Sequence, residues 1–130
     1  MTDGRVPDLR KPHGDHMSPL RKVCHATGAV DQLRYFVDLG QLTLEEHFES
    51  DERMTFTVVA DGGLVPDGYV ETVAINAVEI RPDVFLTSWK EVSGATITHL
   101  EDFERGVVHS RITLPDGTPL ALTGTIKPLD

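Results

Sequence analysis

Short clusters of turn-forming residues recur from Val30 to the end of the chain, and their spacing limits the fold more than any other feature. Examples are Asp61-Gly62-Gly63, Pro66-Asp67-Gly68 and Pro115-Asp116-Gly117. Glycine reaches positive φ, proline fixes φ and aspartate tolerates tight turns. The segments between these clusters are rich in Val, Thr, Phe, Leu and Ile, and a strand with its turn takes roughly 11–12 residues, which predicts a series of short strands.

Eight strands are expected between the turns, at residues 31–38, 41–49, 53–60, 69–80, 84–91, 95–101, 106–114 and 119–127. Apolar and polar residues alternate most regularly around Met54, Phe56 and Val58. Residues 42–48 lose this alternation midway, which indicates a bulge or one helical turn.

Links of hairpin length favour an antiparallel meander. Closing it into an eight-stranded barrel would remove exposed edges and leave room for one small ligand. A β-sandwich is the alternative.

Residues 1–30 contain Pro7, Pro12 and Pro19 without periodicity. We therefore expect an extended N-terminal arm at 1–30, followed by an all-β barrel domain at 31–130.

The charge balance argues against several kinds of partner. The chain has 130 residues, with 21 acidic and 12 basic side chains and a formal net charge of −9. Nucleic acids and anionic membrane surfaces both attract Lys and Arg, so we expect neither as a partner.

There is no apolar run of membrane-spanning length and no secretory signal. Cys24 is the only cysteine, so we expect a cytoplasmic protein without an intramolecular disulfide. A barrel this small could pair as a homodimer through an outer face or an end.

The stretch from Phe85 to Glu91 holds the first candidate chemistry. Period two places Phe85, Thr87, Trp89 and Glu91 on one face and Lys90 on the other, where it should meet water. The only tryptophan and Glu91 would then point into the barrel together. Desolvation in an apolar cavity should raise the pKa of that carboxyl group, which could act as a general acid and base. The simpler interpretation is that Trp89 fills the core and Glu91 lies partly in water.

Two further strands have polar faces whose direction the sequence leaves open. His99 and Glu101 share a face of one strand, and His109, Arg111 and Thr113 share a face of the next. Pointing inward, they would give a polar cavity in which His99, His109 and Arg111 contact a ligand. Pointing outward, they would be solvated, and Glu101 and Arg111 could form a cross-strand ion pair.

The sequence carries no recognised metal or cofactor motif. His13, His16, Cys24 and His25 lie near one another in the expected arm, but without a zinc-binding spacing. There is no P-loop, no dinucleotide-binding fingerprint and no nucleophile elbow. We therefore expect neither a metal nor a cofactor.

Tyr35, in the middle of a strand, is a core residue by type, and its hydroxyl needs a partner if it is buried.

Several runs together are distinctive: Val78 to Glu91 with its Ser88-Trp89-Lys90-Glu91 core, then Ser93 to Thr96, Glu101 to Glu104 and Leu114 to Gly117. These runs resemble the MoaF-like proteins, small calycin (lipocalin-like) barrels named for a molybdenum-metabolism gene. The same stretch is similar to the core of the bacterial phenolic acid decarboxylases, another group of calycin barrels. The likeness extends from Tyr35 to Leu129.

The resemblance to the decarboxylases implies roles for individual residues. In those enzymes the glutamate of Ser-Trp-x-Glu is the catalytic proton donor, and Glu91 occupies that position. Two tyrosines spaced i, i+2 hold the substrate there; Tyr35 matches the first, but Val37 stands at the second. Gly68 stands at the position of the family's site arginine, and Tyr69 follows in the place of a tryptophan. These departures argue against decarboxylation of a hydroxycinnamate by the same mechanism.

Three functions follow as hypotheses. The first is a small lyase, dehydratase, isomerase or cyclase acting on an aromatic or polyketide-like molecule, in which Glu91 moves a proton and Tyr35 orients the substrate. Its other expected ligand contacts include Trp89, Thr87, Phe85 and Tyr69. The second is a non-catalytic, lipocalin-like binder of a small hydrophobic ligand. The third, an accessory role in molybdenum metabolism, is suggested by the family name alone.

Overall fold

The computed structural model describes residues 33–61, 63 and 65–129. The predicted arm at 1–30, with its histidines and Cys24, lies outside these residues. The described chain forms nine strands and no helix: β1 (Leu33–Asp38), β2 (Thr43–Phe48), β3 (Arg53–Ala60), β4 (Val70–Ala74), β5 (Asn76–Arg81), β6 (Val84–Lys90), β7 (Thr96–Asp102), β8 (Val107–Thr113) and β9 (Pro119–Pro128). It therefore holds no helix that could cross a membrane.

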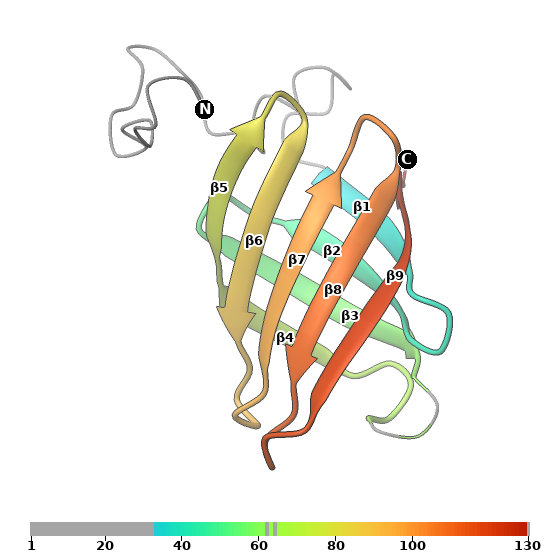
Figure 1. Ribbon diagram of the computed structural model, residues 1–130. Coiled ribbons are helices and arrows are strands. Elements are labelled where there is room, and N and C mark those ends of the chain that lie inside the picture. The colour runs from blue at the N-terminus through green and yellow to red at the C-terminus, as the bar shows by residue number, and fades with distance from the viewer. Residues whose placement is uncertain (1–32, 62, 64, 130) are drawn as a thin grey trace.

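All nine strands belong to one antiparallel sheet in the order β4-β3-β2-β1-β9-β8-β7-β6-β5. The first and last strands pair, with Val37 opposite Ile126, and this pairing rolls the meander into a barrel. In Figure 1, β5 to β9 form the layer nearer the viewer and β1 to β4 cross behind them. The predicted class, a small antiparallel barrel of the lipocalin-like kind, is confirmed.

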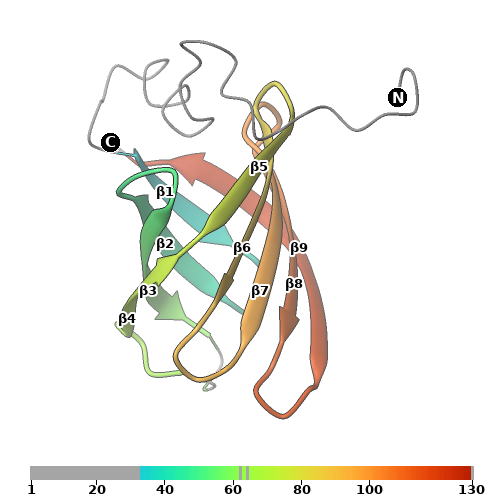
Figure 2. The ribbon, with the colours of Figure 1, turned by 90° about the vertical axis from the view of Figure 1, so that its left-hand side faces the viewer.

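The strand count differs from the predicted eight because the expected strand at 69–80 divides at Ile75. Before that residue the chain pairs with β3, and after it the chain pairs with β6. The Ile75 amide donates to the Glu52 carbonyl oxygen at 2.9 Å. β4 and β5 are therefore the two edges of the sheet, and the barrel is nearly rather than fully closed along the side that faces the viewer in Figure 2.

One end of the barrel is filled by aromatic side chains. Tyr35 packs against Phe48 and Phe103 with ring centroids 6.0 and 4.9 Å apart, and Phe85 lies 5.7 Å from Phe103. Met54 completes this layer and is fully buried. Because this end is packed solid, the interior can be hollow only toward the opposite end.

The irregularity expected within residues 42–48 is a bulge. The register of β2 against β3 shifts between Thr43 and Leu44. Beyond that point β2 alternates regularly, with Leu44, Glu46 and Phe48 buried. The strand thus carries a glutamate on its interior face, directly between two apolar core residues.

Candidate functional site

A cavity of about 440 Å³ lies in the open half of the barrel. Its rim comes from connections at one end, the end at which the hairpins β6–β7 and β8–β9 point downward in Figure 1. Residues of four such connections line it: Gln41, Val65, Ser93 and Pro115. Its wall is mainly aliphatic and aromatic, with Leu44, Phe56, Val58, Ile97 and Leu122 among the lining residues. A small molecule of largely apolar surface fits such a space.

Glu91 lies on the cavity wall just after β6, beside Trp89. The indole Nε1 of Trp89 donates to Glu91 Oε2 at 3.3 Å. Burial raises the pKa of Glu91; the hydrogen bond from Trp89 partly offsets this rise, and the nearby Glu71 carboxylate adds to it. Glu91 is half-buried rather than sealed. Its carboxyl group can therefore exchange a proton with a molecule in the cavity.

Glu71 fixes the geometry of this rim. It accepts a hydrogen bond from the Tyr69 hydroxyl at 2.7 Å and another from the Val92 amide, also at 2.7 Å. The second contact ties β4 to the turn that follows Glu91. Glu71 thus holds together two strands that are not paired by backbone hydrogen bonds.

Deeper in the barrel three charged side chains form a buried cluster. His99 Nδ1 lies 3.3 Å from Glu46 Oε2 and 3.2 Å from Glu101 Oε2. Thr87 donates to the other Glu101 oxygen at 3.0 Å. All four side chains are at most 2% exposed, and among them only His99 lines the cavity.

The charges within this cluster depend on one another. Burial alone would lower the pKa of His99, but hydrogen bonding to Glu101 and Glu46 and their negative charge raise it to about 9. Burial and the neighbouring Glu46 carboxylate raise the pKa of Glu101 to about 8. At neutral pH His99 is therefore an imidazolium, and its Nδ1 lies within 3.3 Å of both glutamate side chains. The imidazole ring lines the cavity, within reach of a molecule bound there.

The same three residues have the donor types of a metal site. Ligand atoms of Glu46, His99 and Glu101 all lie within 4.8 Å of one another. Within the described chain the Glu46 oxygens have no partner outside the cluster, and the buried Ser110 hydroxyl opposite His99 has none. Two carboxylates with one imidazole suit Mn²⁺, Fe²⁺ or Zn²⁺.

The structure gathers some of the sequence-predicted residues around the cavity and separates others. Glu91, Trp89, Tyr69 and His99 line it. The face of Phe85, Thr87 and Trp89 points inward, as predicted. Phe85 and Thr87 lie deeper, away from the cavity lining, and Tyr35 belongs to the aromatic layer at the far end. Of these three, only Thr87 contacts the buried cluster, through its hydrogen bond to Glu101.

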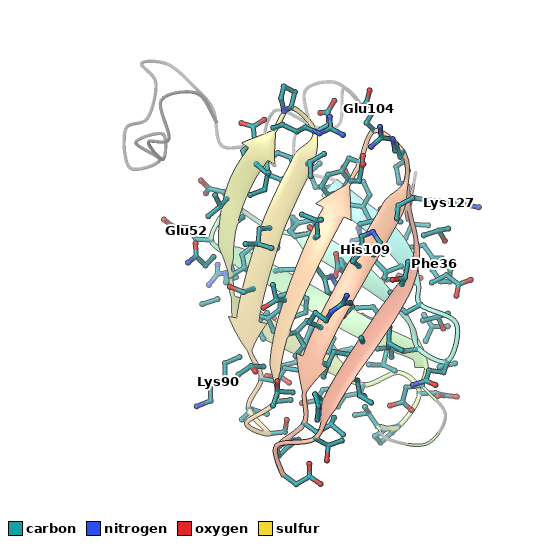
Figure 3. The ribbon with its side chains drawn as sticks, viewed as in Figure 1. Phe36, Glu52, Lys90, Glu104, His109 and Lys127 are labelled. Carbon is teal, nitrogen blue, oxygen red and sulfur yellow. The ribbon has the colours of Figure 1, made fainter. Side chains whose placement is uncertain are left out.

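His109 and Arg111 lie outside the barrel, so of the two directions left open the outward one is found, and the ligand contacts predicted for them are corrected. Val108 and Ser110 occupy the interior positions of β8, so period two turns His109 and Arg111 outward. Figure 3 labels His109, which bonds to Thr123 Oγ1 on the outer face at 3.0 Å. The alternative ion pair between Glu101 and Arg111 is also wrong, because Glu101 is buried inside while Arg111 is exposed.

Sequence reasoning missed three acidic residues of the interior: Glu46, Asp61 and Glu71. Of these, Glu46 had a usable signal, because it alternates with Leu44 and Phe48 on one strand face. Asp61 lies in a glycine-rich turn and Glu71 next to an edge, where no periodicity reveals which side chains point inward.

Comparison with known proteins shows the family to which the chain belongs. A model of the MoaF-like family matches residues 32–127. The chain belongs to the MoaF-like family. A search of curated proteins gave no match. Among solved structures, a Burkholderia vietnamiensis protein described as a "putative beta-lactamase" is similar, with a TM-score of 0.70 and 19% identity over 75% of this chain and 93% of that one. At this identity the likeness concerns the fold alone.

Proposed function

We propose that this MoaF-like barrel is a small-molecule enzyme of the lyase, dehydratase or cyclase type, with Glu91 as its general acid and base. The observation that carries the proposal is that Glu91 and His99 both line the cavity and both contact Trp89. Trp89 lies between them, donating to Glu91 at 3.3 Å and packing edge-on against the His99 ring at a centroid distance of 4.9 Å.

Glu91 would take up a proton from the substrate and return it. A general acid or base works best when its pKa lies near the working pH, and burial moves the Glu91 carboxyl in that direction. The mechanism needs no covalent intermediate.

His99 would supply the complementary positive charge. Glu46 and Glu101 hold its Nδ1 and keep it protonated at neutral pH. Its remaining N–H could donate to a carbonyl or leaving hydroxyl while Glu91 removes a proton elsewhere on the substrate. Elimination, isomerisation and cyclisation can all be catalysed by such a pair of opposite proton-transfer groups.

The substrate would be a compact aromatic or polyketide-like molecule without a carboxylate. Four acidic side chains line the cavity, and no Lys or Arg does so among the described residues. An anionic hydroxycinnamate would meet no cationic clamp there. This argues against the decarboxylase reaction and in favour of proton transfer on a molecule that is not an anion.

Turnover by Glu91→Gln tests the assignment. Substrates would be found by incubating the protein with aromatic and polyketide-like compounds and looking for products by mass spectrometry. We expect Glu91→Gln to lower kcat by about 10²–10⁴-fold, the usual contribution of a general acid or base. Glu52→Gln, an exposed change in the β2–β3 turn, is the matched control. Full turnover by Glu91→Gln would refute the proposal.

A non-catalytic binder is the second candidate, favoured by the mainly apolar wall. It predicts tight binding without conversion, and an affinity that Glu91→Gln leaves unchanged. Mass spectrometry of the bound molecule after incubation separates the two functions, since an enzyme changes its ligand and a binder returns it intact.

A further inference from the structure

The wall of the cavity is strongly unbalanced in charge. Asp61, Glu71, Glu91 and Asp116 all line it, and His99 is the only basic side chain among the described lining residues. Low-dielectric walls focus the field of such groups into the space between them. The cavity therefore favours a cation over an anion of the same shape.

Asp61 adds a group that lacks a partner. Its side chain is 4% exposed, and Oδ1 accepts the Gly63 amide at 2.9 Å. Oδ2 is buried and has no hydrogen-bond partner in the part of the chain that the structure describes. Buried carboxylate oxygens are normally satisfied, because an unpaired one costs free energy. An N–H donor on a molecule in the cavity, or a positive charge near Oδ2, would remove that cost.

Three aromatic rings lie close together in the same cavity. Phe56 lies 6.3 Å from Tyr69 and 6.3 Å from Trp89, measured between ring centroids. All three line the cavity. Aromatic faces attract organic cations, and their attraction grows when water is excluded. Aliphatic groups around a charged nitrogen would pack against these rings while the charge is balanced by the carboxylates.

We infer that the cavity takes a small organic ammonium ion, with its nitrogen near Asp61 and its apolar groups against Phe56, Tyr69 and Trp89. This inference rests on the proposed function in one respect, since it names the chemical class of the substrate that Glu91 would act on. An organic ammonium ion uses the carboxylates and the aromatic rings together, whereas an inorganic cation would use the carboxylates alone.

The test compares two probes that differ only in charge. Phenyltrimethylammonium and tert-butylbenzene have the same shape, and Trp89, the chain's only tryptophan, reports binding by its fluorescence. We expect the ammonium probe to bind about tenfold more tightly than the neutral probe. Cinnamate, an anion, should bind more weakly than either. Equal affinities for the two isosteres, or no binding of the ammonium ion, would overturn the inference.

A matched pair of variants locates the charge effect. Asp61→Asn keeps an acceptor for the Gly63 amide and removes the charge, so the preference for the ammonium probe should fall severalfold with tert-butylbenzene binding unchanged. Asp67→Asn is the control, because Asp67 is exposed in the same loop and does not line the cavity. An unchanged preference in Asp61→Asn would overturn the placement of the nitrogen. The wild-type comparison of isosteres needs no variant and stands if Asp61→Asn does not fold.

The outcomes separate this inference from the proposed function. If Glu91→Gln abolishes turnover of a substrate but the isosteres bind equally, the enzyme assignment stands and the ammonium inference fails. If the ammonium probe is preferred and Glu91→Gln retains full turnover, the reverse holds.

Discussion

At the residue scale, Trp89 connects the two titratable groups of the candidate site. Its Nε1–H stabilises the carboxylate form of Glu91, and its ring packs against His99. One side chain therefore influences both the acid–base strength of Glu91 and the position of the imidazole. Its role can be tested separately from that of the carboxyl group itself.

Trp89→Phe keeps an aromatic ring and removes the donor. Since the Trp89 hydrogen bond lowers the pKa of Glu91 against the effect of burial, its loss should raise that pKa further. The acidic limb of the pH profile of kcat/KM should move to higher pH. Phe56→Leu changes the same wall without changing a donor and should leave the limb in place. An unmoved acidic limb in Trp89→Phe would contradict the role given to Nε1.

Glu46 and its neighbour Glu45 form a natural matched pair. Glu46 is buried beside His99, whereas Glu45 is exposed on the outer face of β2. Glu46→Gln removes a negative charge beside the imidazolium, so the pKa of His99 should fall from about 9 toward its usual 6.5. An NMR titration of the imidazole signals measures this pKa. Glu45→Gln should not change it, and equal pKa values in both variants would show that Glu46 does not act on His99.

Metal analysis checks the second property of the cluster. A shared proton and a bound divalent ion are mutually exclusive at Nδ1, because a metal ligand must be deprotonated. With His99 protonated, dialysis of purified protein against a chelator should leave its thermal unfolding midpoint unchanged. Loss of one equivalent of metal together with a lower midpoint would assign Glu46, His99 and Glu101 as metal ligands.

At the element scale, the contact of β9 with β1 turns an open meander into a barrel. The two strands pair from Tyr35 opposite Pro128 to Asp38 opposite Thr125. The next residue of β9 is Gly124, where a Cβ atom would overlap the Asp38 carbonyl oxygen. Only glycine allows the backbones to approach so closely at the point where β9 leaves β1.

Gly124→Ala should therefore loosen the closure of the barrel. We expect a loss of roughly 1–3 kcal/mol in the free energy of unfolding, typical of an overpacked site. Urea unfolding followed by circular dichroism measures it. Thr125→Ala, an exposed change at the adjacent position, should cost less. If Gly124→Ala is as stable as the wild type, the close approach does not constrain the fold.

At the scale of the whole molecule, the barrel holds ionisable groups in its interior. Glu46, His99 and Glu101 cross between opposite layers of the barrel, from β2 to β7. Aliphatic residues could fill the same space at a lower cost in free energy. Buried charges lose their hydration, and only well-placed partners offset that loss. Such a cluster is a candidate functional site, because strongly shifted pKa values gather at such sites.

The cluster makes the stability of the whole domain depend on pH. The pKa of His99 is about 9 in the fold against 6.5 as the ordinary value, and that of Glu101 is about 8 against 4.5. Between these limits the folded state binds more protons than the unfolded state, so its stability falls as the pH rises from about 5 to about 9. Thermal unfolding at a series of pH values measures this fall.

Glu101→Gln should flatten that profile, since it removes one titrating group and keeps an oxygen for the Thr87 hydroxyl. The exposed His109→Gln should leave the slope unchanged. A wild-type protein whose unfolding midpoint rises between pH 6 and 9 would contradict the buried cluster.

Much of this molecule could be predicted from local pattern. Turn residues at short intervals and the alternation of β3, β6 and β8 gave the antiparallel barrel class, and the inward face of Trp89 and Glu91 followed from period two. Alternation showed that His109 and Arg111 share a face of β8. It did not show which face points into the barrel, and the burial of Val108 and Ser110 decides this. Glu46 shares a strand face with Leu44 and Phe48, but it was missed because a charged residue in a strand is normally taken to face water.

The amino-acid sequence by itself determined the strands, their turns and which residues share a face, because these depend on neighbours in the chain. Tertiary structure alone decided that β9 returns to β1, that the strand at 69–80 divides at Ile75, and that Glu46 meets His99. Contacts between β2 and β7 join residues about fifty positions apart, and no local periodicity encodes them. The cavity exists for the same reason: the barrel is packed at the end of Tyr35 and Phe103 and hollow at the end where Glu91 and Asp61 line the wall.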